Sequence, residues 1–188
     1  MPVYFNGTSV TNPYFNGTRI DYIYFNGTLV YQRSTPYYAI QNGYKQSGAP
    51  NAWAWSSGLS HKNGDGLIAN GPTSYPNTAF YGGAGHYGSE ENPAWGADTN
   101  TISTNNCKYL TIDVMSFQWG NDPYVGPLFT VYGNGTVIKS EYINHDAQLV
   151  SYNFDISAYS NVRARIELSG VDADCWVNVG FVNVHIHN

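Results

Sequence analysis

Charged residues are scarce in this sequence. Asp, Glu, Lys and Arg make up 11% of the 188 residues, and the eight basic residues form no cluster. Nucleic acids and anionic membranes bind clustered Lys and Arg, so neither is expected as a partner. No apolar run approaches the ~20 residues of a membrane-spanning helix. The first residues, MPVYFNGT, have neither the basic nor the apolar region of a secretory signal, so we expect no secretory route.

Cysteine is almost absent, with two residues in the whole chain. Cys107 and Cys175 lie far apart and do not match the spacing of a metal site. A disulfide between them and two buried thiols are both compatible with the sequence. No cofactor is expected.

Catalytic signatures are missing as well. The sequence has no G-x-S-x-G, H-E-x-x-H or P-loop motif, and its 13 carboxylates are scattered. Glu90 and Glu91 follow a Gly-rich stretch and are typical of a solvated turn. We therefore expect no catalytic residues and a non-enzymatic protein.

Metal binding has only weak candidates. His185 and His187 share one face of the last predicted strand, but no third ligand has suitable spacing, so a terminal strand is the favoured interpretation. Metal capture by three symmetry-related copies in a trimer is the alternative. Asp172 and Asp174 could hold a structural Ca²⁺, although Asx turns explain them more simply. We expect no metal.

Aromatic residues are abundant at 16%, and the phrase YFNGT occurs three times, at Tyr4–Thr8, Tyr14–Thr18 and Tyr24–Thr28. Asn-Gly between short apolar runs predicts a two-residue type I′ hairpin turn, because both residues tolerate φ > 0. Each copy therefore predicts a small β-hairpin. Turn formation also explains the four Asn-Gly-Thr sequons better than glycosylation does; they begin at Asn6, Asn16, Asn26 and Asn134.

The repeats define a first module, residues 1–33. A single hairpin of this size is marginally stable in water, so the copies are expected to stack on one another or on neighbouring chains. One apolar face would stay bare in a monomer, which marks an interface for docking or for a homotrimer. The predicted interface residues are Val3, Phe5, Phe15, Ile23 and Phe25.

The second module, residues 34–188, predicts an antiparallel, jelly-roll-like β-sandwich, so the whole chain is expected to be all-β with no helix. Its first half is rich in loops. A phase switch in the last run predicts a β-bulge near Gly180. The expected strands include 37–40, 52–56, 66–69, 77–81, 109–117, 127–132, 136–143, 150–156, 162–168 and 175–187.

Exposed aromatic rings in this module are candidates for glycan binding. Flat rings stack on sugars, and loops on a rigid sandwich commonly carry recognition residues. The candidates are Trp53, Trp55, Trp95, Trp119 and Tyr124. For each one, plugging the end of the sandwich is the competing interpretation, and Trp176 is expected in the core.

Two features resemble a known group of proteins. The tandem YFNGT phrases resemble those of virion structural proteins of tailed bacteriophages and prophages, and Asp155-Ile156-Ser157-Ala158-Tyr159 resembles a phrase in their C-terminal β-sandwiches. The second phrase also occurs in carbohydrate-binding modules. The resemblance covers about residues 1–33 and 102–188. It implies a head or tail fibre or decoration protein, made in the host bacterial cytoplasm and located in the virion. Its partners would be other virion proteins, its own copies in a homotrimer and host cell-surface glycans.

Overall fold

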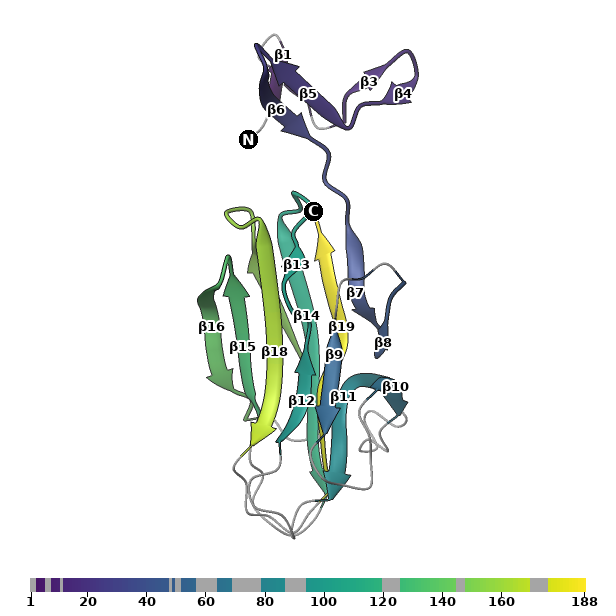
Figure 1. The fold of residues 1–188 in the computed structure, drawn as a ribbon, viewed down its shortest axis with the longest axis vertical. Helices are drawn as coiled ribbons and strands as arrows, with labels where there is room; N and C mark the ends of the chain where they lie inside the picture. The colour runs from purple at the N-terminus through teal and green to yellow at the C-terminus, as the bar shows by residue number, and fades with distance from the viewer. Residues whose placement is uncertain are drawn as a thin grey trace.

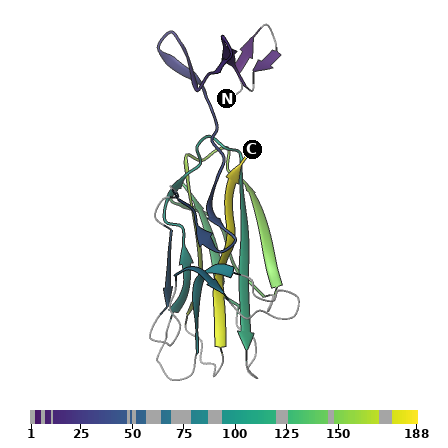
Figure 2. The same cartoon turned by 90° about the vertical axis from the view of Figure 1, so that its right-hand side faces the viewer.

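The computed structural model describes residues 3–5, 8–10, 12–47, 49, 52–56, 64–68, 79–86, 94–119, 126–144, 148–169 and 176–188. Within these ranges the chain consists of strands, turns and extended connections. An elongated body holds most of the strands, and the N-terminal hairpins project from one end of it (Figures 1 and 2). In the described part, no helix is long and apolar enough to cross a membrane.

The N-terminal hairpins form three separate two-stranded antiparallel sheets. Their strands are β1 (Val3–Phe5) with β2 (Thr8–Val10), β3 (Tyr14–Phe15) with β4 (Thr18–Arg19), and β5 (Tyr22–Phe25) with β6 (Thr28–Gln32). Each hairpin pairs only within itself. We call residues 3–33, as far as they are described, the arm.

The body is a sandwich of two antiparallel sheets. The seven-stranded sheet has the order β10-β11-β19-β14-β17, with β7 on β19 and β8 on β7. Its strands are β7 (Tyr37–Gln41), β8 (Tyr44–Lys45), β10 (Gly64–Ile68), β11 (Ala79–His86), β14 (Tyr109–Trp119), β17 (Gln148–Asp155) and β19 (Trp176–His187).

The six-stranded sheet has the order β16-β15-β18-β12-β9, with β13 on β18. Its strands are β9 (Trp53–Ser56), β12 (Ala94–Asp98), β13 (Ile102–Ser103), β15 (Leu128–Gly133), β16 (Thr136–Tyr142) and β18 (Asn161–Ser169). The all-β fold with an antiparallel sandwich confirms the predicted fold class. The sequence pattern did not reveal β8, β12 or β13.

Apolar side chains of alternating residues fill the space between the sheets. Leu110 and Ile112 of β14 meet Ile166 and Ala164 of β18 in one buried cluster. At the side of the sandwich, Phe129 stacks on Tyr152 with ring centroids 4.6 Å apart. This cluster contains no side chain of the described arm, so the sandwich core is built without it.

The final strand contains the predicted bulge. The register between β14 and β19 shifts between Asp113 and Val114, where Val182 is the extra residue. The strand therefore places His185 and His187, both half-buried, on its outer side beyond the bulge, while Val184 and Ile186 stay in the core. The bulge lies two residues beyond the predicted position at Gly180.

Gly180 and Gly82 pair across β19 and β11. A Cβ at Gly180 would lie 2.5 Å from the Tyr81 carbonyl oxygen and 2.7 Å from Cδ2 of Phe80. The strands are therefore close enough for the Phe80 ring to lie over the backbone of Gly180, which only glycine permits.

The two cysteines do not form a disulfide. Cys107 carries a free thiol. Cys175 lies outside the described residues, but its neighbour Trp176 pairs with Trp119 at the far end of β14. The Cys107 end of that strand pairs with His187, eleven residues further along β19 and therefore roughly 35 Å away. Of the two alternatives left open by the sequence, the disulfide is excluded.

Candidate functional site

The arm is built on the predicted turns. Asn16 and Gly17 have φ of 49° and 79°, and Asn26 and Gly27 have 48° and 77°. Both central residues are left-handed, as a type I′ turn requires. The first copy's turn, at Asn6, lies outside the described residues. The fourth sequon, at Asn134, forms the same kind of turn with φ of 49°.

The surface of the arm is strongly aromatic. Among the described residues, ten large hydrophobic side chains are exposed, and six of them belong to the second and third hairpins. They are Tyr14 (61%), Phe15 (70%), Tyr22 (54%), Tyr24 (62%), Phe25 (68%) and Leu29 (43%). Exposed apolar surface at this density marks an interaction site.

The predicted interface residues fall into three groups. Phe15 and Phe25 stand next to the Asn-Gly tips and are exposed, whereas Ile23 is half-buried. Val3 and Phe5 lie on β1, in a part of the arm whose side chains are not described. Tyr24 and Phe25 are neighbours along β5, and both side chains are exposed. A register shift between Ile23 and Tyr24 disturbs the alternation of β5.

Three hydrogen bonds, which we call the clasp, join the linker that follows the arm to the sandwich. The backbone N–H of Thr35 donates to the Asn105 carbonyl at 3.1 Å. The Asn105 amide donates to the Thr35 carbonyl at 3.4 Å. Nδ2 of Asn188, the last residue, donates to Oγ of Ser34 at 2.8 Å. The linker is thus tied to a turn of the sandwich and to the end of β19.

Tyr37 anchors the start of β7 just below the clasp. Its hydroxyl donates to the Ser103 carbonyl at 2.7 Å. Burial, with a smaller effect of Cys107, raises the pKa of Tyr37 to about 12. The phenol therefore keeps its proton, and its hydrogen bond, across the physiological pH range.

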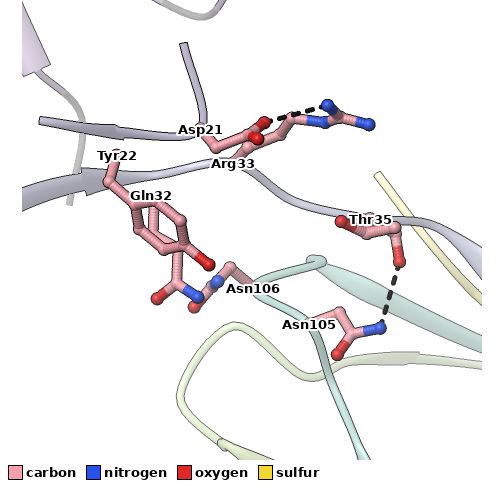
Figure 3. A pocket seen from close by; sticks show the side chains of 7 residues that line it. All are labelled: Asp21, Tyr22, Gln32, Arg33, Thr35, Asn105 and Asn106. Carbon is pink, nitrogen blue, oxygen red and sulfur yellow. Dashed lines mark hydrogen bonds and ion pairs between the residues drawn. The ribbon is translucent and has the colours of Figure 1, made fainter.

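A pocket of about 330 Å³ opens between the arm and the sandwich. Its arm wall comes from the base of the third hairpin, and its other wall comes from the linker and the turn at Asn105 and Asn106. Figure 3 shows the lining side chains, which are Asp21, Tyr22, Gln32, Arg33, Thr35, Asn105 and Asn106. Nη1 of Arg33 donates to Oδ1 of Asp21 at 2.9 Å, so the charged groups neutralise each other. The sequence did not predict this pocket, because its walls are some 70 residues apart and no local motif joins them.

The predicted glycan residues do not form one described cluster. Trp53 and Trp55 lie on β9, where Trp53 pairs with Asp98 and Trp55 with Gly96. Trp95 is on β12 and Trp119 ends β14, and only the backbone positions of Trp55, Trp95 and Trp119 are described. Tyr124 lies outside the described residues.

Trp53 is the one of these whose side chain is placed. It is 38% exposed, and its indole N–H donates to Oδ1 of Asn100 at 2.7 Å. Asn100 N–H in turn donates to the buried Asp98 carboxylate at 2.6 Å. Arg163 forms a bidentate pair with that carboxylate and lies over the Tyr132 ring at 5.6 Å. This pairing raises the pKa of Arg163, with desolvation acting against it.

The two terminal histidines belong to a column of rings on the outer face of the seven-stranded sheet. Tyr38 stacks on His185 with centroids 3.9 Å apart, and His185 stacks on His187 at 4.6 Å. Nε2 of His187 also lies 2.8 Å from Oγ1 of Thr111. Burial, then the neighbouring His187, lowers the pKa of His185. Among the described residues, no group of three His, Cys, Asp or Glu side chains is arranged to hold a metal ion.

The remaining weak candidates lie elsewhere. Glu90, Glu91, Asp172 and Asp174 are all outside the described residues. The Ca²⁺ and Asx-turn interpretations of the VDAD segment therefore both stay predictions.

Comparisons with known proteins give only distant likenesses. No protein-family model and no curated protein matches the chain. A family 61 carbohydrate-binding module, solved in complex with β-1,4-galactotriose, is 10% identical with a TM-score of 0.47, covering 74% of this chain and 90% of that one. The K3 adhesin domain of Lys-gingipain from Porphyromonas gingivalis is 16% identical with a TM-score of 0.41, covering 60% and 75%.

A family 35 carbohydrate-binding module from an environmental isolate is 20% identical with a TM-score of 0.29, covering 70% of this chain and 90% of that one. At these identities and TM-scores, the likenesses assign no ligand and no role to this chain.

Proposed function

We propose that the chain is a non-enzymatic attachment protein of a virion, held in place by its arm and presenting its β-sandwich outward. The observation that carries the proposal is the exposure of Tyr14, Phe15, Tyr24 and Phe25 on hairpins that contribute nothing to the sandwich core. Exposing this much aromatic surface to water is unfavourable. An assembled particle, in which another protein surface covers the tips, removes that cost.

The arm also has the form expected of an attachment device. Its hairpins pair only internally, so each presents its own tip. Repetition of one weak contact raises the overall affinity through effective concentration. The partner in this proposal is a second and third copy of the chain, or a neighbouring virion protein, and assembly takes place in the cytoplasm of the bacterial host.

The native mass of the full chain, measured by sedimentation over a concentration series, tests the self-assembly form of the proposal. The expected result is a species of three times the 20.8 kDa chain mass. Deleting residues 1–33, or changing Phe15 and Phe25 together to Ser, should return the protein to a monomer with a folded sandwich. Tyr142→Ser is the matched control, because Tyr142 is 65% exposed but lies on β16, outside the arm.

Two results would contradict this form of the proposal. One is a deletion variant that keeps the oligomer of the full chain. The other is loss of the oligomer in the Tyr142→Ser control but not in the Phe15 and Phe25 variant. A full chain that is monomeric at all concentrations would remove self-assembly and leave docking to another virion protein as the attachment mode.

Glycan recognition by the sandwich is a second candidate role. The supporting observation is Trp53, whose ring is partly exposed and fixed in orientation by its bond to Asn100. A ring held in this way loses little entropy when a sugar stacks on it. A glycan array with the wild type, Trp53→Ala and Trp95→Ala tests the role. Binding that survives Trp53→Ala unchanged, or no binding at high protein concentration, would refute it.

A further inference from the structure

We infer that the pocket between the arm and the sandwich is a binding site for a single neutral sugar ring. The inference is independent of both roles proposed above, since it concerns neither the hairpin tips nor Trp53. It rests on the lining, the volume and the unpaired polar groups of the pocket in Figure 3.

The first argument is charge. Among the described lining residues, the charged side chains are those of Asp21 and Arg33, and they form an ion pair with each other. Neither is left over to neutralise a phosphate, a carboxylate or an amine. An ionic ligand would therefore lose hydration without gaining a counter-ion, so the pocket favours a neutral ligand.

The second argument is the supply of hydrogen-bonding groups. The side chains of Tyr22, Gln32 and Asn106 make no hydrogen bond to any other described residue. Each carboxamide offers two N–H donors and one carbonyl acceptor, and the phenol can donate or accept. A sugar ring presents hydroxyl groups of the same mixed character around its edge. Figure 3 shows Tyr22 and Gln32 extending from the hairpin towards Asn106 on the opposite wall.

The third argument is shape. Tyr22 is the one aromatic ring among the described lining residues, and its flat face can pack against the C–H face of a pyranose. The volume of about 330 Å³ lies at the small end of the range of about 300–1,000 Å³ that is typical of small-molecule sites. It fits one sugar ring or a very short peptide and excludes a folded partner.

The pocket floor is preorganised. Thr104, Asn105, Asn106 and Cys107 form a turn closed by Cys107 N–H donating to the Thr104 carbonyl at 2.9 Å. Asn105 and Asn106 both have positive φ, of 49° and 57°, and the clasp to Thr35 holds the turn in place. Because the two walls belong to the arm and the sandwich, a bound sugar would also stabilise the observed orientation of the arm.

Titration of the isotopically labelled full chain with methyl glycosides of glucose, galactose, mannose and N-acetylglucosamine, followed by NMR chemical shifts, tests the inference. At least one sugar is expected to shift the side-chain amide signals of Gln32 and Asn106 together with the backbone signal of Asn105. Tyr22→Ala, Gln32→Ala and Asn106→Gly should each weaken the binding about fivefold, as the loss of one hydrogen-bonding or stacking contact predicts.

Tyr44→Ala is the matched control, because Tyr44 is a similarly exposed tyrosine (46%) on β8 that does not line the pocket. It should leave binding unchanged. Trialanine amide serves as the peptide probe. The inference is overturned if no sugar moves the pocket signals at tens of millimolar, if only the peptide moves them, or if the sugars shift only signals around Trp53. Equal loss in Tyr22→Ala and Tyr44→Ala would likewise overturn it.

Discussion

The turn at Asn134 and Gly135 gives the sharpest test of how these hairpins are stabilised. Asn134 has φ of 49°, and its side-chain oxygen accepts three hydrogen bonds. The donors are Ser160 N–H at 3.1 Å, Ser160 hydroxyl at 3.0 Å and Asn161 N–H at 3.1 Å. One side chain thus ties the β15–β16 hairpin to the start of β18.

Three substitutions separate the contribution of these hydrogen bonds from that of the left-handed backbone. Asn134→Gly removes the hydrogen bonds but keeps the left-handed backbone, and we expect a loss of about 1–2 kcal/mol because the three bonds share one oxygen and face solvent. Asn134→Ala adds a Cβ to that backbone, which costs about 1–2 kcal/mol more. Asn134→Asp keeps an acceptor and a residue that tolerates positive φ, so it should stay within about 1 kcal/mol of the wild type.

The measurement is urea unfolding followed by tryptophan fluorescence, with the melting temperature as a second readout. For a chain of this size, 1 kcal/mol corresponds to roughly 2–4 °C. Asn26→Ala is the control, since Asn26 has the same φ of 48° but lies in the arm. It should leave the unfolding of the sandwich unchanged. An Asn134→Gly protein as stable as the wild type would refute the role of the hydrogen bonds, and equal stabilities of the Gly and Ala variants would refute the backbone argument.

Two further predictions concern the sandwich. The pKa of His185 is lowered in the folded protein, so the unfolded chain binds more protons below the unfolded value of about 6.5. The free energy of unfolding should therefore fall as the pH drops through 6.5. His185→Phe, which keeps the ring stack on Tyr38, should weaken that pH dependence in urea titrations at several pH values. An unchanged pH dependence in this variant would assign it to other groups. Gly180→Ala should destabilise the sandwich by about 1–3 kcal/mol because its Cβ meets backbone and ring atoms. Gly17→Ala is the control: its Cβ would have no atom within 4 Å, and although its φ is 79°, it should leave the unfolding of the sandwich unchanged. A Gly180→Ala protein of wild-type stability would show that the strands can separate at no cost.

The sequence predicted the elements whose local signals are strong. Three features were predicted from neighbouring residues alone: the Asn-Gly turns, the alternating strand at 162–168 and the phase change near Gly180. The turns follow from the backbone preferences of Asn and Gly, and the other two follow from the two-residue period of apolar side chains in a strand. The strand β12, Ala94–Asp98, was missed because Ala and Gly have little strand preference. Its backbone pairs on both sides, with buried Ala97 opposite Ala54 of β9 and Ile166 of β18, so tertiary pairing makes it a strand.

The candidate sites also divide into those that the sequence predicts and those that depend on tertiary structure. The exposed Phe15 and Phe25 follow from the repeat, because a ten-residue hairpin is too small to bury its own rings. The pocket between the arm and the sandwich could not be predicted, since Gln32 and Asn106 line one pocket only once the linker is tied to the 104–107 turn. The ring column of Tyr38, His185 and His187 likewise depends on the pairing of β7 with β19, two strands at opposite ends of the sequence.

Because the hairpins pair separately, the arm can change in length without a change in the rest of the fold. Since no described strand is shared between hairpins, gain or loss of one ten-residue unit breaks no backbone pairing in the others and leaves the sandwich core intact. Recombination between the near-identical copies would change the length of the arm and its number of exposed hairpin tips by one hairpin at a time. In the attachment role proposed above, the number of hairpins would set the strength of attachment, while the sandwich folds with unchanged stability.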